Sequence, residues 1–168
     1  VLRLHVIDSP LTELGYEIGG LTKLRRLEID GSELRTLPIS LSKCTSLTFV
    51  GVSFSELSRF PAVIQHLREL EQLHLSGNTI AKIPQWVGKL RALRTLNWAH
   101  NDISVLPIQL AKLTNLQHLD LHQNMISKIP NWLYTMTNLR SMNLKGNAIP
   151  IEDVWRLQCD LPMCDIEF

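Results

Sequence analysis

The sequence lacks the features that identify most enzymes, nucleic-acid-binding proteins and membrane proteins. Its 17 basic and 16 acidic residues leave a net charge of +1, which gives no electrostatic basis for binding nucleic acid or an anionic membrane. Polar residues interrupt every apolar run well short of the ~20 residues that cross a bilayer. The sequence contains no GxSxG turn, glycine-rich phosphate loop, HExxH or CxxC pair. We therefore expect a chain with no catalytic activity, no cofactor, no metal and no membrane insertion.

Cysteine is also scarce, with only Cys44, Cys159 and Cys164. An odd number without a framework spacing favours reduced thiols and so predicts a cytoplasmic location, and the lack of any Asn-x-Ser/Thr acceptor agrees with this. A disulfide between Cys159 and Cys164 is the alternative. Because the chain starts at Val1 and not at a methionine, we expect either a monomer or part of a longer chain.

What the sequence does contain is a repeated unit, which is clearest at residues 116–138. The first half of this unit alternates apolar and polar residues, as a strand does. The second half opens with Pro130 and spaces its apolar residues by three, as a helical turn does. One strand and one turn cannot bury a core alone, so the unit needs copies beside it. The copies follow one another every 23 residues, starting at Val1, Leu24, Leu47, Leu70, Leu93, Leu116 and Leu139.

The repeated pattern, LxxLxLxxNxLxxLPxxIxxL, resembles the leucine-rich repeat family, in its intracellular 23-residue subclass. The resemblance implies an α/β solenoid, a curved horseshoe with a parallel sheet on the concave face and short helices or 3₁₀ turns on the convex face. The spacing agrees, because strands 23 residues apart pair in parallel when each connection returns over the same side. We expect a single leucine-rich repeat domain over residues 1–168.

The pattern changes after Ile149, where we expect a C-terminal cap at about residues 150–168. Residues 151–158 can form a helix whose first turn is acidic, and the closing CDIEF alternates as a short strand does. Such a cover hides the last core layer of a solenoid.

One polar column recurs where the chain turns out of the sheet. A buried asparagine can donate to and accept from neighbouring turns, so we interpret this column as structural and not as a ligand site. Serine occupies the column in the first three copies. The asparagines are Asn78, Asn101, Asn124 and Asn147.

Strand positions that alternate with the core leucines face outward, and they differ in every copy. This variation is typical of a surface for one particular partner, and facing direction alone selects the candidate contacts. Phe49, beside Gly51 and Ser53, is predicted to be either an exposed anchor or local packing with Phe54, and both readings stay open. The predicted partner-binding residues are Arg26, Glu28, Phe49, His74, Asn97, His118, Asp120, His122 and Asn143.

The row His118, Asp120 and His122 could suggest a metal site. On a strand, however, residues four apart stand roughly 13 Å from each other, which is too far to chelate one ion. We therefore interpret these side chains as partner contacts. If Asp120 stands between the two imidazoles, it favours their charged forms, and partner binding would then depend on pH.

The sequence therefore predicts a non-catalytic protein–protein interaction module that binds a partner protein on its concave face. Two alternatives remain open. The chain could be the recognition arm of a larger signalling enzyme or receptor, or it could be a bacterial leucine-rich repeat protein or effector. Fold alone does not choose between partners.

Overall fold

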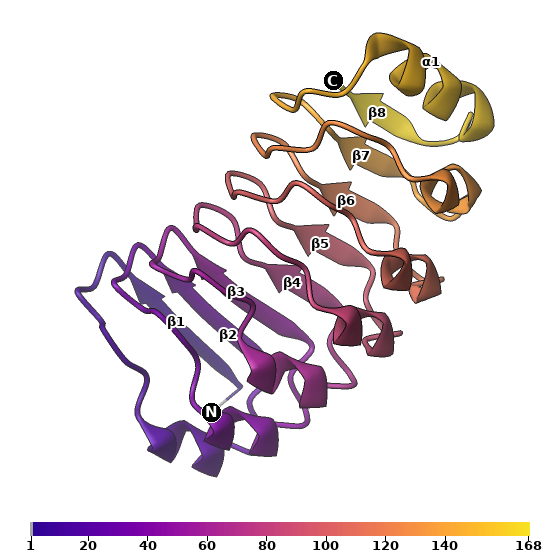
Figure 1. Ribbon diagram of the computed structural model, residues 1–168. Coiled ribbons are helices and arrows are strands. Elements are labelled where there is room, and N and C mark those ends of the chain that lie inside the picture. Colours follow the sequence, from indigo (N-terminus) through magenta and orange to yellow (C-terminus); the bar gives the residue numbers. More distant parts are fainter. Residues whose placement is uncertain (1) are drawn as a thin grey trace.

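The computed structural model describes residues 2–168, in which eight strands form one open parallel sheet in chain order (Figure 1). Equivalent residues of successive copies lie side by side, as Leu4, Leu27 and Val50 do across the first three strands. The predicted start of the first copy, Val1, lies outside the described residues. The strands are β1 (Arg3–Ile7), β2 (Arg26–Asp30), β3 (Phe49–Ser53), β4 (Gln72–His74), β5 (Thr95–Asn97), β6 (His118–Asp120), β7 (Ser141–Asn143) and β8 (Asp165–Glu167).

Short 3₁₀ helices connect the strands on the opposite side of the solenoid (Figure 1). All but the first follow a proline, whose fixed φ and missing N–H suit the residue before a helical turn. The predicted leucine-rich repeat solenoid, with its parallel sheet and short turns, is confirmed. The 3₁₀ helices are η1 (Tyr16–Gly20), η2 (Ile39–Lys43), η3 (Ala62–His66), η4 (Gln85–Lys89), η5 (Ile108–Lys112) and η6 (Asn131–Thr135).

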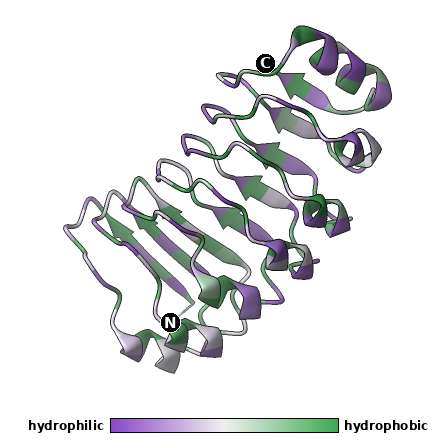
Figure 2. Ribbon diagram, in the orientation of Figure 1, coloured by the Kyte–Doolittle hydropathy of each residue, from purple (hydrophilic) through white to green (hydrophobic). Residues whose placement is uncertain are grey.

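The recurring apolar columns form one continuous core between the sheet and the 3₁₀ helices. Apolar and polar residues alternate along the strands, as Figure 2 shows. Trp98 occupies a core column that is aliphatic in the other copies, and it is fully buried. Its ring meets the edge of Phe60 with centroids 5.0 Å apart, so this aromatic pair fills the enlarged layer.

The asparagine column forms a ladder of hydrogen bonds between copies. Asn101 accepts a bond from the backbone N–H of Ile80 (3.0 Å) and donates to the carbonyls of Leu75, Trp98 and Ala99. Asn78 and Asn124 make the equivalent bonds, and all three of these side chains are buried. The ladder fixes the backbone at the end of the strands.

The eighth residue of each copy, just past the strand, adopts a left-handed backbone conformation. At Gly77 the absence of a side chain leaves room for a neighbour, because a Cβ there would lie only 2.5 Å from the ring of Phe54. The residues of this column have φ between 44° and 69°, and they are Asp8, Gly31, Phe54, Gly77, His100, Gln123 and Gly146.

The last copy ends in helix α1 (Ile151–Asp160) and strand β8, which pairs with β7. Val154 and Leu157 of α1 are buried against the core, and Ile166 of β8 adds to the same layer. All three cysteine thiols are free. Across residues 2–168, every helix is too short or too polar to span a membrane.

Candidate binding surface

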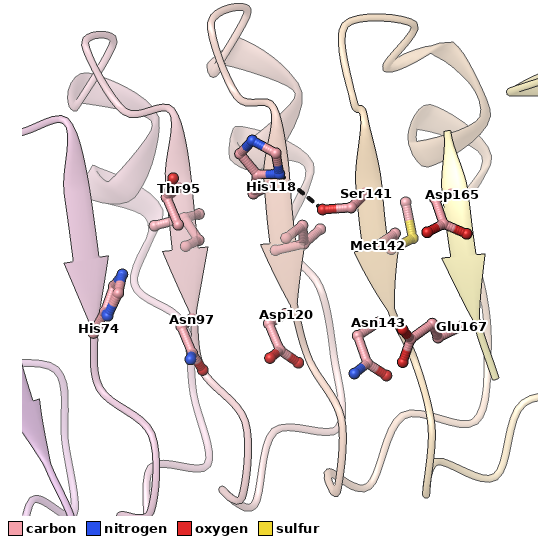
Figure 3. Close-up of a pocket in the computed structure, with 12 residues that line it drawn as sticks. His74, Thr95, Asn97, His118, Asp120, Ser141, Met142, Asn143, Asp165 and Glu167 are labelled. Carbon is pink, nitrogen blue, oxygen red and sulfur yellow. Dashed lines mark hydrogen bonds between the residues drawn. The ribbon is translucent and has the colours of Figure 1, made fainter. Parts of the chain in front are cut away.

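The outward-facing side chains of β1–β8 form the surface that we call the concave surface. Five of the nine predicted contacts meet in one shallow depression of about 310 Å³ over β4–β8 (Figure 3). The depression also contains residues that the sequence did not single out as contacts: Thr95, Ser141, Asp165 and Glu167. The five predicted residues are His74, Asn97, His118, Asp120 and Asn143.

Asp165 and Glu167 come from β8, which follows helix α1 and so falls outside the 23-residue pattern. The CDIEF alternation predicts this strand but does not show that its two carboxylates extend the row of outward-facing residues. In the structure Asp165 pairs with Ser141, and Glu167 pairs with Asn143. Together with Asp120 they make the C-terminal part of the concave surface acidic, although Lys145 Nζ lies 3.0 Å from the Glu167 carboxylate.

Arg26 and Glu28 lie at the other end of the concave surface and bind each other. The Arg26 guanidinium donates to both carboxylate oxygens of Glu28, with the shortest contact at 2.9 Å. His5 Nε2 lies 3.5 Å from the same carboxylate. A partner that contacts either residue therefore meets a pre-formed ion pair.

Phe49 is buried, with 5% of its surface exposed, so the prediction of an exposed aromatic anchor was wrong. The guanidinium carbon of Arg26 lies 3.4 Å from the centroid of the Phe49 ring. The His74 ring, from the next copy, packs edge-to-face with Phe49, and the two ring centroids are 4.9 Å apart. The alternative prediction, local packing, describes Phe49 but not Phe54, which is 59% exposed. Phe49 is buried because side chains of the two neighbouring copies, Arg26 and His74, cover its ring.

His74 forms part of this packed cluster. Its Nε2 is buried and has no hydrogen-bond partner within residues 2–168. Burial lowers the pKa of His74, and the nearby Arg26 cation lowers this pKa further. His74 is thus held in its neutral form.

The contacts of His118, Asp120 and His122 fall into two separate groups. Strand β6 ends at Asp120, so His122 lies beyond the strand. His118 Nδ1 is 2.8 Å from the Ser141 hydroxyl, whereas Asp120 accepts a 2.7 Å bond from His122 Nδ1. The prediction that Asp120 acts on both imidazoles was wrong, because of the two rings only that of His122 is hydrogen-bonded to the Asp120 carboxylate, and His118 contacts Ser141 instead.

His122 instead meets a histidine of the preceding copy. His122 Nε2 and His100 Nε2 are 3.0 Å apart, and the two rings are nearly perpendicular. The sequence did not predict this pair, because the two residues are 22 positions apart and occupy different positions of their copies; His100 has a left-handed backbone, with φ of 52°. Among residues 2–168, no group of three or more His, Cys, Asp or Glu side chains is placed to hold a metal ion.

Comparison with known proteins agrees with this architecture. Residues 72–151 match a family described as a leucine-rich repeat region. The solved structure of LRR protein LIC12759 from Leptospira interrogans superposes with a TM-score of 0.88 at 28% sequence identity, and the match covers 94% of this chain. These two matches support a leucine-rich repeat family for this chain.

The leucine-rich repeats of this chain span only 40% of the length of the Leptospira protein. No curated protein matches the sequence. The family establishes a repeat protein of a kind that commonly binds other proteins, and it leaves the partner open.

Proposed function

We propose that this chain is a non-catalytic protein-interaction module that binds a partner protein on its concave surface. One observation carries the proposal. The core columns recur from copy to copy, whereas the outward residues of the same strands differ, and five of the predicted contacts gather in one depression. Positions that the scaffold leaves free are available for recognition.

The surface is suited to binding because its backbone is already ordered. Each of the inner strands β2–β7 is bonded to both neighbours, and the asparagine ladder holds the strand ends. A partner therefore orders few main-chain groups when it binds, which lowers the entropic cost of association. His118 and Asp165 are exposed, and with the half-buried Asn97 and Asn143 they offer hydrogen-bonding groups of both kinds.

A second candidate is that the chain is the recognition segment of a longer protein, such as a signalling enzyme, a receptor or a bacterial leucine-rich repeat protein. The observation that favours it is the likeness to the Leptospira protein, in which the matched repeats form less than half of the chain. Both candidates use the same concave surface.

The test is affinity capture with quantitative mass spectrometry, comparing the wild-type chain with a concave variant, His118→Ala with Asp165→Ala. We expect the concave variant to lose the proteins that the wild type enriches, because both side chains line the depression. The matched control carries Gln85→Ala and Lys89→Ala, two exposed residues of η4, and should keep them. Loss in the η4 variant with retention in the concave variant would refute the concave assignment, and circular dichroism would check that each variant is folded.

A further inference from the structure

We propose that His100 and His122 form a binding site for a divalent transition-metal ion of the zinc class, with Asp120 orienting His122. The observation is that two imidazole Nε2 atoms from neighbouring copies face each other at 3.0 Å. This site is separate from the partner contacts tested above, and it stands whether or not the proposed function is correct.

Asp120 determines which tautomer the His122 ring adopts. Its Oδ1 accepts the Nδ1–H of His122 at 2.7 Å and also the backbone N–H of His122 at 3.1 Å. With the proton held on Nδ1, the neutral ring presents the lone pair of Nε2 toward His100. A carboxylate behind a ligating histidine is the common arrangement in metal sites, because it fixes the ring and makes the metal-binding nitrogen more basic.

The distance between the two nitrogens fits one shared ion. Zn–N bonds of about 2.0–2.1 Å that meet at a tetrahedral angle place their nitrogens roughly 3.3 Å apart. The two nitrogens therefore need to separate by a few tenths of an ångström, and the proton that His100 Nε2 shares with His122 Nε2 in the metal-free chain moves to Nδ1 of His100. The rings lie at 82° to each other with centroids 4.6 Å apart, so they are not stacked and the ion can approach the nitrogens from the solvent side.

The backbone under both histidines is held in place. The N–H of His100 donates to the carbonyl of His122 at 2.9 Å, which ties the two residues together directly. Each is followed closely by a buried asparagine: Asn101 donates to the carbonyl of Ala99, and Asn124 donates to the carbonyl of His122. The pair is thus positioned before any ion binds, which favours binding.

The chemistry of the site selects the class of ion. Two imidazole nitrogens favour Zn²⁺, Ni²⁺ or Cu²⁺ over Mg²⁺ and Ca²⁺, which prefer oxygen ligands. Since a third protein ligand is missing from the described residues, water completes the coordination in the isolated chain. His100 is exposed, and the side chain of His122 is 29% exposed, so these water positions are open to solvent.

The test is calorimetric titration of the chain with Zn²⁺, using a Cys159→Ser background to remove the exposed thiol. We expect one ion per chain. His100→Asn, which suits the left-handed backbone, and His122→Gln should each abolish this binding. Asp120→Asn should weaken it about tenfold or more. The matched control His118→Gln, also on the concave surface, should bind as tightly as the background.

A spectroscopic measurement separates orientation by Asp120 from a general structural role. In ¹⁵N NMR spectra, Zn²⁺ should shift Nε2 of His100 and His122, and Asp120→Asn should change the tautomer balance of His122 before any ion is added. The proposal is overturned if the background chain binds no Zn²⁺, or if its affinity is unchanged in either histidine variant. It is equally overturned if Mg²⁺ binds as tightly. An unchanged affinity and tautomer balance in Asp120→Asn would remove Asp120 from the site.

Discussion

At the scale of single residues, Asn101 shows how one side chain can replace the regular bonding of a sheet. The chain turns away from the strand at this position, and the backbone N–H of Ile80 has Asn101 Oδ1 as its partner. The three carbonyls to which Asn101 donates also accept bonds from other groups, among them Asn78 and Asn124. The energetic importance of Asn101 therefore depends mainly on one buried N–H.

We expect Asn101→Ala to lower the free energy of unfolding by ~1–3 kcal/mol, because the Ile80 N–H would remain buried without an acceptor. Urea unfolding followed by circular dichroism measures the change. The matched control is Asn115→Ala, which removes an exposed bond to the Arg91 carbonyl and should change stability by far less. Equal effects in the two variants would show that the turn has another way to satisfy this N–H.

His74 gives a prediction about pH. Burial lowers its pKa in the folded state, followed in size by the Arg26 cation, so the unfolded chain binds more protons between the two pKa values. The stability that the chain has with His74 neutral is fully present above the unfolded pKa of about 6.5. It is lost as the pH falls toward the lower pKa of His74 in the folded state. His74→Gln should therefore flatten the fall in stability below about pH 6.5.

The measurement is a series of urea unfolding curves across this acidic range. His66→Gln is the control, because His66 is exposed on the opposite side of the solenoid. It should leave the pH dependence as it is in the wild type. An identical slope in His74→Gln and wild type would mean that His74 titrates normally.

At the scale of elements, the strands differ in length along the solenoid. β1–β3 have five residues each and precede a serine in the turn, whereas β4–β7 have three and precede an asparagine. In the asparagine copies the side-chain amide donates to carbonyls of its own turn, as Asn78 does to those of Leu75 and Ser76. Because β6 has only three residues and ends at Asp120, its third outward position, His122, lies outside the strand.

Helix α1 leads to a prediction at the scale of elements. Leu157 is fully buried against the last layer, so Leu157→Ala should cost ~2–4 kcal/mol of local stability. Because each copy contacts only its neighbours, the effect should be concentrated in β7 and β8. Hydrogen exchange should then speed up in these strands and stay unchanged in β2. Met163→Ala, at an 85% exposed position, is the control, and equal changes in all strands would contradict this view.

At the scale of the whole molecule, the concave surface has two parts of different character. In the N-terminal part, Arg26, Glu28 and Phe49 are packed against one another, and His74, which also lines the depression, packs against this cluster from β4. In the C-terminal part, the depression over β4–β8 leaves polar side chains open to solvent (Figure 3). We therefore expect a partner to contact mainly the C-terminal strands, and we expect the packed side chains of the N-terminal part to contribute few of the contacts.

The sequence by itself determined the period, the parallel sheet, the core columns and the asparagine column, because each depends only on the position of a residue within its copy. Tertiary structure decided the burial of Phe49, which requires Arg26 from one neighbouring copy and His74 from the other. It also decided the meeting of His100 with His122, in which His100 has a left-handed backbone. The physical reason is that contacts between copies depend on side-chain direction and on the sign of φ, and a repeating pattern of residue types specifies neither.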